Sequence, residues 1–177
     1  MESIYNVQIS PDALAMLRVS QGLIENNQPE QALTLVSQCS MRDSAPMRNA
    51  RGVCLLHLGK YEEAFALFRE LYFPNNAFAV PHDTPTEVRV NYVSSLLMLG
   101  NVQVAASLLY NIPDQKHPAV KRLRAAIRVW KRELPWWGKV LLPVGLYPES
   151  APRLGRHVGR FWFPPMRQTP APQKQAA

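Results

Sequence analysis

Apolar residues recur every three or four positions through most of the first 134 residues, a spacing typical of amphipathic helices. The pattern predicts seven helices, at residues 11–26, 29–40, 45–58, 61–73, 85–99, 102–111 and 118–133. We therefore expect an all-α fold in which short turns join the helices.

Residues that start and stop helices stand at the predicted boundaries. Ser10 and Ser44 are expected to cap the helices that follow them, and Thr84–Glu87 has the form of a capping box with a proline inside it. Gly59 and Gly100 stand where a helix ends and the chain must turn sharply, which favours a residue that tolerates positive φ.

Three segments share one arrangement of turn, helix start and alanine. In each segment the alanine is followed four residues later by an apolar residue, and the three alanines are Ala32, Ala64 and Ala105. A second amphipathic segment precedes each of them. The body of the chain therefore alternates helix, tight turn and helix three times, which indicates a protein built from repeats.

The middle unit has the most informative sequence, RNARGVCLLHLGKYEEAFALFREL. It resembles a tetratricopeptide repeat, because Gly52, Gly59, Tyr61, Ala64 and Phe68 fall at the positions of that family's signature. The first and third units match more loosely, and the resemblance covers roughly residues 13–118. It implies three repeats, at about residues 13–44, 45–78 and 86–117, with a longer loop at 74–85.

The resemblance implies a right-handed α-solenoid of three helix pairs. Since no single pair buries its apolar face, neighbouring pairs must stack, and the last pair needs a cap. Residues 118–134 suit a capping helix, with basic residues on its outer faces and an apolar stripe of Val120, Leu123, Ile127, Trp130 and Leu134. We expect a repeat domain at 1–134 and a basic, aromatic, largely irregular and partly disordered tail at 135–177.

In this family the first helices of the repeats line a concave groove that binds partners. By resemblance, the partner-binding residues here would be Leu17, Arg18, Gln21, Asn49, Val53, His57, Val90, Asn91, Ser94 and Met98. Their mixed polar and apolar character suits a peptide segment of another protein. The implied function is protein–protein interaction, as an adaptor, an assembly factor or a chaperone.

One subgroup of the family grips the terminal carboxylate of a peptide with a clamp of cationic residues. The matching places in this chain hold Leu17, Gln21, Ala50, Glu87 and Asn91, so the two lysines and the arginine of that clamp are missing. Recognition of that particular kind is therefore not expected.

The net charge of +7 is distributed unevenly along the chain. Residues 1–114 hold seven Lys and Arg against eleven Asp and Glu, whereas residues 115–177 hold thirteen against two. A basic end of this kind indicates an acidic counterpart. The sequence leaves open whether that counterpart is nucleic acid, an anionic membrane surface, a partner protein or the acidic body of the chain itself.

The tail adds aromatic residues to this basic charge. Trp136–Tyr147 is too short to span a bilayer, which takes about 20 residues, so no transmembrane segment is expected. The tail residues suited to bind nucleic acid or an anionic membrane surface are Trp136, Trp137, Arg156, Arg160 and Trp162. Alternatively the tail docks on the repeats, because aromatic side chains are unfavourable in water, with Trp136 and Trp137 covering the open end of the stack.

The sequence favours a binding protein without catalytic activity or a cofactor. His57, His82, His117 and His157 show no metal-ligand spacing, and no phosphate-binding loop or nucleophile motif occurs. The two cysteines form no disulfide framework and the N-terminal residues form no secretory signal, so we expect a reducing, cytoplasmic location. The identity of the partner and the oligomeric state are not specified by any of these patterns.

Overall fold

The computed structural model describes residues 3–77, 79–142, 150–155 and 158–164 of the 177-residue chain. Over these residues it contains eight α-helices, the 3-10 helix η1 (Pro74–Asn76) and no strand, so the prediction of an all-α fold is confirmed for them. The helices are α1 (Pro11–Glu25), α2 (Pro29–Gln38), α3 (Ala45–His57), α4 (Tyr61–Tyr72), α5 (Thr86–Met98), α6 (Val102–Tyr110), α7 (Pro118–Glu133) and α8 (Trp136–Leu141).

The ends of α1 to α7 agree with the predicted ends to within two residues. Ser10 caps α1, because its hydroxyl accepts a hydrogen bond from the Ala13 N–H at 3.2 Å, whereas Ser44 precedes α3 without a side-chain capping bond. The capping box predicted at Thr84–Glu87 is wrong. The N-cap of α5 is Pro85, one residue later, and Thr84 therefore lies too early to cap the helix.

Helix α8 was not predicted, since residues 135–142 belong to the tail that we expected to be largely irregular. It is a single short helix that begins directly after Pro135, and it continues the chain beyond α7. The disorder predicted within the tail concerns the residues from Thr169 onward, which lie outside the described part of the chain.

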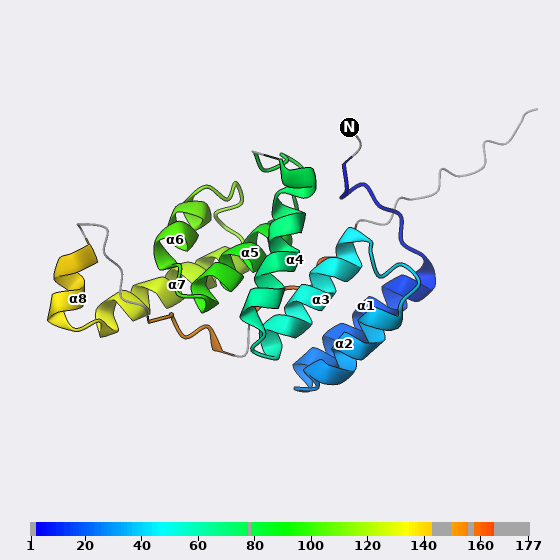
Figure 1. Cartoon of the computed structure of the whole chain (residues 1–177), viewed down its shortest axis with the longest axis horizontal. Coiled ribbons are helices and arrows are strands. Elements are labelled where there is room, and N and C mark those ends of the chain that lie inside the picture. Colours follow the sequence, from blue (N-terminus) through cyan, green and yellow to red (C-terminus); the bar gives the residue numbers. More distant parts are fainter. Residues whose placement is uncertain (1–2, 78, 143–149, 156–157, 165–177) are drawn as a thin grey trace, which may run out of the picture.

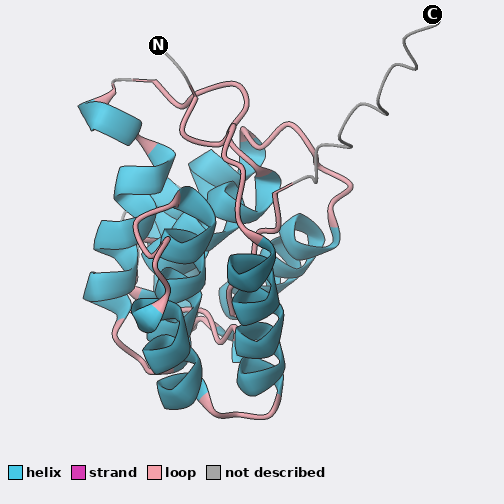
Figure 2. Cartoon of the chain, turned by 90° about the vertical axis from the view of Figure 1, so that its right-hand side faces the viewer, coloured by secondary structure: helices cyan, strands magenta, loops and turns pink. Residues whose placement is uncertain are grey.

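Consecutive helices pack against one another from α1 through to α7, and α1 with α3, α3 with α5 and α5 with α7 also make contact. The odd-numbered helices therefore form one side of the molecule. Figure 1 shows the helices following one another along the long axis, from α1 and α2 at one end to α8 at the other. Figure 2 looks along this row and shows loops connecting the helices at their ends.

Small residues allow the helices to approach closely. Ala32, Ala64 and Ala105, one in each even-numbered helix from α2 to α6, have no exposed surface. Gly52 in α3 lies against Phe68 in α4, and a Cβ atom built at Gly52 would stand 2.6 Å from two atoms of the Phe68 ring. Since Phe68 is itself fully buried, the ring has no free space into which to move.

The long loop before α5 is organised by a buried arginine. Arg89 is 8% exposed, and its guanidinium group donates hydrogen bonds to the carbonyl oxygens of Thr84 at 3.0 Å, Pro81 at 2.9 Å and His82 at 3.3 Å. These bonds satisfy the charged group and attach the loop to the start of α5.

The contact between Gly52 and Phe68 gives the first prediction. Gly52→Ala should destabilise the protein by about 1–3 kcal/mol, because the added methyl group overpacks a closed contact between α3 and α4. Gly22→Ala is the matched control, since nothing lies within 4 Å of a Cβ at Gly22 in α1. That control should raise stability by about 0.5–1 kcal/mol. Urea unfolding of both variants measures the difference, and equal effects of the two would contradict the assigned packing.

Candidate functional site

Two asparagines form a buried polar pair on the side of the molecule made by the odd-numbered helices. Asn49 in α3 and Asn91 in α5 are both fully buried. The Asn91 Nδ2 donates a hydrogen bond to the Asn49 Oδ1 at 2.7 Å, so the two side chains join neighbouring helices. Buried amides need further partners, because an unpaired donor or acceptor in a dry environment is costly.

The backbone of Arg160, in the C-terminal segment, supplies those partners. Its N–H donates to the Asn91 Oδ1 at 2.7 Å. Its carbonyl oxygen accepts from the Asn91 Nδ2 at 2.7 Å and from the Asn49 Nδ2 at 2.9 Å. The two asparagines thus satisfy both backbone groups of one extended residue, and this contact is independent of the Arg160 side chain.

Glycine is required at the position before Arg160. Gly159 has a φ of +82°, a conformation that other residues rarely adopt. A Cβ atom at Gly159 would also stand 3.1 and 3.2 Å from the two γ-carbons of Val53 in α3. The backbone of the segment therefore lies directly on the helix, at a distance that leaves little room for a side chain.

Apolar side chains anchor the segment on either side of this point. Val158 and Trp162 are buried and belong to the main core cluster, and Pro164 is buried as well. Phe161 and Phe163 are half-buried and pack against a second cluster that contains Leu17 and Ala50. We call residues 158–164 the docked segment, because backbone hydrogen bonds and apolar burial both attach it to the repeats.

Tyr5, near the N-terminus, packs against the docked segment. The rings of Tyr5 and Trp162 meet edge to face, with centroids 5.5 Å apart and planes at 79°. The Tyr5 hydroxyl donates a hydrogen bond to the carbonyl oxygen of Leu71 in α4. Burial raises the pKa of Tyr5 from 10.0 to about 12, so the phenol stays neutral and can remain a donor.

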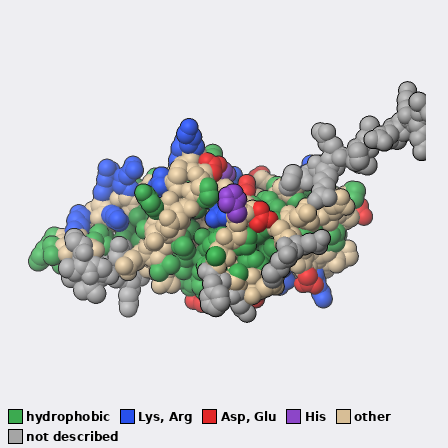
Figure 3. All heavy atoms as spheres, turned by 90° about the horizontal axis from the view of Figure 1, so that it is seen from above, with side chains coloured by type: hydrophobic (Ala, Val, Ile, Leu, Met, Phe, Trp, Pro, Cys, Tyr) green, Lys and Arg blue, Asp and Glu red, His purple; other side chains and the backbone are tan. Residues whose placement is uncertain are grey.

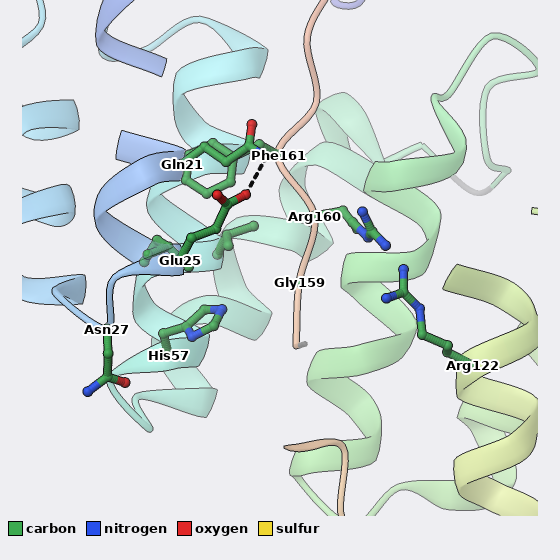
Figure 4. Close-up of a pocket in the computed structure, with 10 residues that line it drawn as sticks. Gln21, Glu25, Asn27, His57, Arg122, Gly159, Arg160 and Phe161 are labelled. Atoms are coloured by element: carbon green, nitrogen blue, oxygen red, sulfur yellow. Dashed lines mark hydrogen bonds between the residues drawn. The ribbon is translucent and has the colours of Figure 1, made fainter. Parts of the chain in front are cut away.

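A pocket with a volume of about 480 Å³ lies beside the docked segment, between the end of α1, α3 and α7. Figure 4 shows Gln21 and Glu25 on one side of it, joined by a hydrogen bond of 2.9 Å. On the other side the guanidinium groups of Arg122 and Arg160 point toward each other. Neither arginine forms an ion pair with any carboxylate of the described residues, so this side of the pocket is positively charged.

The structure brings together seven of the ten residues expected to line the groove. Those around the docked segment and its pocket are Gln21, Asn49, Val53, His57, Val90, Asn91 and Ser94. Leu17 is fully buried in the second core cluster beneath Phe161 and Phe163. Arg18 is exposed on α1, and Met98 is half-buried against the main core at the end of α5.

The tail residues have different environments. Trp162 is buried in the core. Arg160 is held through its backbone, and its side chain is exposed. Arg156 lies outside the described residues. The expectation that Trp136 and Trp137 cover the end of the stack is wrong, since they are 78% and 50% exposed. Trp130 and Leu134 of the α7 stripe are buried there instead, and α8 extends past them.

The buried thiol of Cys54 lies in α3, the helix that also carries Asn49. Burial raises the pKa of the Cys54 thiol to about 12, so the reactive thiolate is scarce at neutral pH. Within the described part of the chain, no three His, Cys, Asp or Glu residues are grouped so that they could hold a metal ion.

The side formed by α1, α3 and α5 can bind an extended backbone, an apolar side chain on either side of it and an acidic group near Arg122.

Comparison of the chain with protein-family models, with curated proteins and with solved structures finds no match.

The asparagine pair gives a prediction about the docked segment. Asn91→Ala removes three hydrogen bonds at about 0.5–1.5 kcal/mol each, so release of the segment should increase about tenfold or more. The rate of limited cleavage by trypsin after Arg160 measures that release. Ser95→Ala is the matched control, because Ser95 is also fully buried in α5 but bonds to the Tyr92 carbonyl oxygen of its own helix. Equal cleavage rates in both variants would contradict the role of Asn91.

Tyr5 gives a prediction about alkaline pH. Its pKa in the folded protein, about 12, lies above the ordinary value of 10.0. The contribution of Tyr5 to the free energy of unfolding is therefore fully present below pH 10 and is lost as the pH rises through 12. Urea unfolding across this range should therefore show a shallower fall in stability for Tyr5→Phe than for the unaltered chain. Burial also raises the pKa values of Tyr72 and Tyr92, which both proteins retain. Parallel curves would show that Tyr5 is not buried beside Trp162.

Proposed function

We propose that this chain is a protein-interaction module of three tetratricopeptide-like helix pairs, α1–α2, α3–α4 and α5–α6, with α7 as the cap. The order of the helices, the contacts among the odd-numbered helices and the buried alanines support this arrangement. The approach of Gly52 to Phe68 also supports it, because both residues belong to the family signature.

The function of the module would be to hold an extended peptide segment of another protein on the side formed by α1, α3 and α5. The observation that carries this proposal is the pair of Asn49 and Asn91, which holds the backbone N–H and C=O of Arg160. A site that recognises backbone groups accepts any extended segment whose neighbouring side chains fit. The proposal includes no catalytic step and no cofactor, and the two buried free cysteines suit a reducing compartment such as the cytoplasm.

The docked segment would act as an intramolecular competitor of the partner. A segment tethered to its own site has an effective concentration of about a millimolar, so a partner must bind tightly enough to displace it. The pocket beside Gln21 and His57 is open next to the docked segment and offers a competing peptide its first contacts. The partner peptide would then replace the contacts of Val158, Arg160 and Trp162.

A synthetic peptide of residues 150–164 tests this function. The unaltered chain should bind the labelled peptide weakly, whereas Trp162→Ala should bind it at least about tenfold more tightly, because loss of a buried Trp weakens the internal competitor by about 3–5 kcal/mol. Trp137→Ala is the matched control, since this tryptophan is half exposed and distant in sequence from the docked segment. Fluorescence anisotropy measures the three affinities.

Adding Asn91→Ala to Trp162→Ala should abolish peptide binding, because the backbone contacts are then lost as well. Gly159→Ala, which introduces a methyl group against Val53, provides a second way to release the segment if Trp162→Ala unfolds. Failure of every released variant to bind the peptide, or binding that survives the loss of Asn91, would refute the proposed function. Partners captured from cell extract by Trp162→Ala should be displaced by the same peptide.

A further inference from the structure

The end of the molecule opposite α1 exposes large hydrophobic side chains. Trp136, Trp137 and Val140 in α8 are 78%, 50% and 63% exposed, and Tyr110 at the end of α6 is 76% exposed. Two adjacent exposed tryptophans on one short helix are unusual, because each ring removes on the order of 150–250 Å² of surface from water when it is covered. Figure 3 shows hydrophobic side chains at this tip of the molecule.

The same end carries a concentration of positive charge. Residues 118–142 contain seven Lys and Arg and a single acidic residue, Glu133. None of these seven cations forms an ion pair within the part of the chain that the structure describes. Figure 3 shows Lys and Arg side chains gathered along one side of this end of the molecule, next to the hydrophobic tip.

The cations of α7 follow the helix as a stripe. Lys121, Arg124, Arg128 and Lys131 are spaced by three and four residues, so they lie on one face, beside the apolar stripe that α7 buries. Lys131 and Lys139 lie on either side of the two tryptophans in the sequence. Cationic and aromatic groups are therefore combined at one end, which we call the basic-aromatic tip (Arg128, Lys131, Arg132, Trp136, Trp137, Lys139 and Val140).

A groove between α6 and α7 opens next to this tip. It has a volume of about 360 Å³, and Ala106, Leu109 and Ile127 give it an apolar lining. Arg124, Arg128 and Lys131 line the same groove, so apolar surface and cationic groups adjoin within it. That combination suits an amphiphile with an anionic head and an apolar chain.

We propose that the basic-aromatic tip binds the surface of membranes that contain anionic phospholipids. Tryptophan rings favour the interfacial zone of a bilayer, and Lys and Arg beside them are attracted to anionic headgroups. Nucleic acid would also attract the cations, but the exposed Val140 and the apolar groove have no counterpart in a phosphate backbone. Within the described residues, no helix has both the length and the apolar character needed to cross a bilayer, and the proposed attachment does not require one.

This inference is independent of the proposed peptide-binding function. Asn49, Asn91 and the docked segment lie on α3 and α5, whereas the basic-aromatic tip belongs to α7 and α8. A protein with both sites would bring a bound peptide to a membrane surface. A negative result for peptide binding would leave the membrane proposal standing, and a negative result for vesicle binding would leave the peptide proposal standing.

Binding of the full chain to lipid vesicles tests the inference. The chain should bind vesicles of phosphatidylcholine with added phosphatidylserine, bind phosphatidylcholine alone at least about tenfold more weakly, and dissociate as salt is raised. Vesicles with brominated acyl chains should quench the fluorescence of Trp136 and Trp137. Trp130 and Trp162, which are buried, should not be quenched, so part of the emission remains as an internal reference.

Two pairs of matched variants separate the contribution of the tryptophans to vesicle binding from that of the cations. Trp136→Ser/Trp137→Ser should weaken binding at least about tenfold and remove the quenching, whereas Val19→Ser/Val104→Ser alters exposed apolar residues elsewhere and should leave binding unchanged. Lys131→Glu/Arg132→Glu should weaken binding by more than about twentyfold, since each cation near an anionic surface contributes about fivefold. Arg42→Glu/Lys60→Glu makes the same change in net charge elsewhere and should have a much smaller effect.

Three results would overturn the inference. The first is absence of binding to anionic vesicles by the unaltered chain. The second is binding that the tryptophan variant retains in full, which would reduce the interaction to charge alone. The third is tighter binding to single-stranded DNA than to vesicles with the same dependence on Lys131 and Arg132, which would assign the tip to nucleic acid.

Discussion

The buried amides of Asn49 and Asn91 impose the constraint on which the rest of the structure depends. Two fully buried side-chain amides need hydrogen-bond partners, and an unsatisfied buried polar group costs about 1–3 kcal/mol. The pair satisfies only part of this need internally, through the bond from Asn91 to Asn49. Whatever covers these residues must therefore present a hydrogen-bond donor and an acceptor, as the backbone of Arg160 does. The same requirement that completes the fold defines the chemistry of a partner.

The packing of the helices determines where these amides lie. Gly52 follows Asn49 by one turn of α3, and its contact with Phe68 fixes how closely α3 approaches α4. Helix α4 packs in turn against α5, which carries Asn91. A change at the interface of α3 and α4 would thus move one asparagine relative to the other. Gly52 and Phe68 are thus connected to Asn49 and Asn91 through these contacts.

The sequence allows the helices and part of the site to be predicted, for identifiable reasons. Helix ends follow from local signals such as Ser10, Gly59 and Gly100, and these signals act within a few residues. Asn49 and Asn91 were expected on the binding side because the repeat register places them there. The resemblance that supplied this register remains part of the proposal, since no comparison supports it independently.

Other features depend on contacts between residues far apart in the sequence. The docking of residues 158–164 joins Arg160 to residues 69 and 111 positions earlier, and its only local indications are a glycine and neighbouring aromatic residues. Docking of the tail on the repeats was one of the alternatives that the charge distribution left open. The exposure of Trp136 and Trp137 could not be predicted from the sequence. Burial of Trp136 and Trp137 was expected only if the tail docked on the repeats, and both instead belong to a helix that extends past the last packed layer.

The molecule thus has one side that holds an extended backbone and one end that carries exposed aromatic and cationic groups. The hydrogen bonds between the two residues require that Asn91 hold the backbone of Arg160 in solution as well. Hydrogen exchange of the Arg160 amide, resolved by NMR, tests this claim most directly, because that N–H donates to the Asn91 Oδ1. This amide should exchange more slowly than in an unstructured peptide by about a hundredfold or more. Exchange at the rate of an unstructured peptide would contradict it.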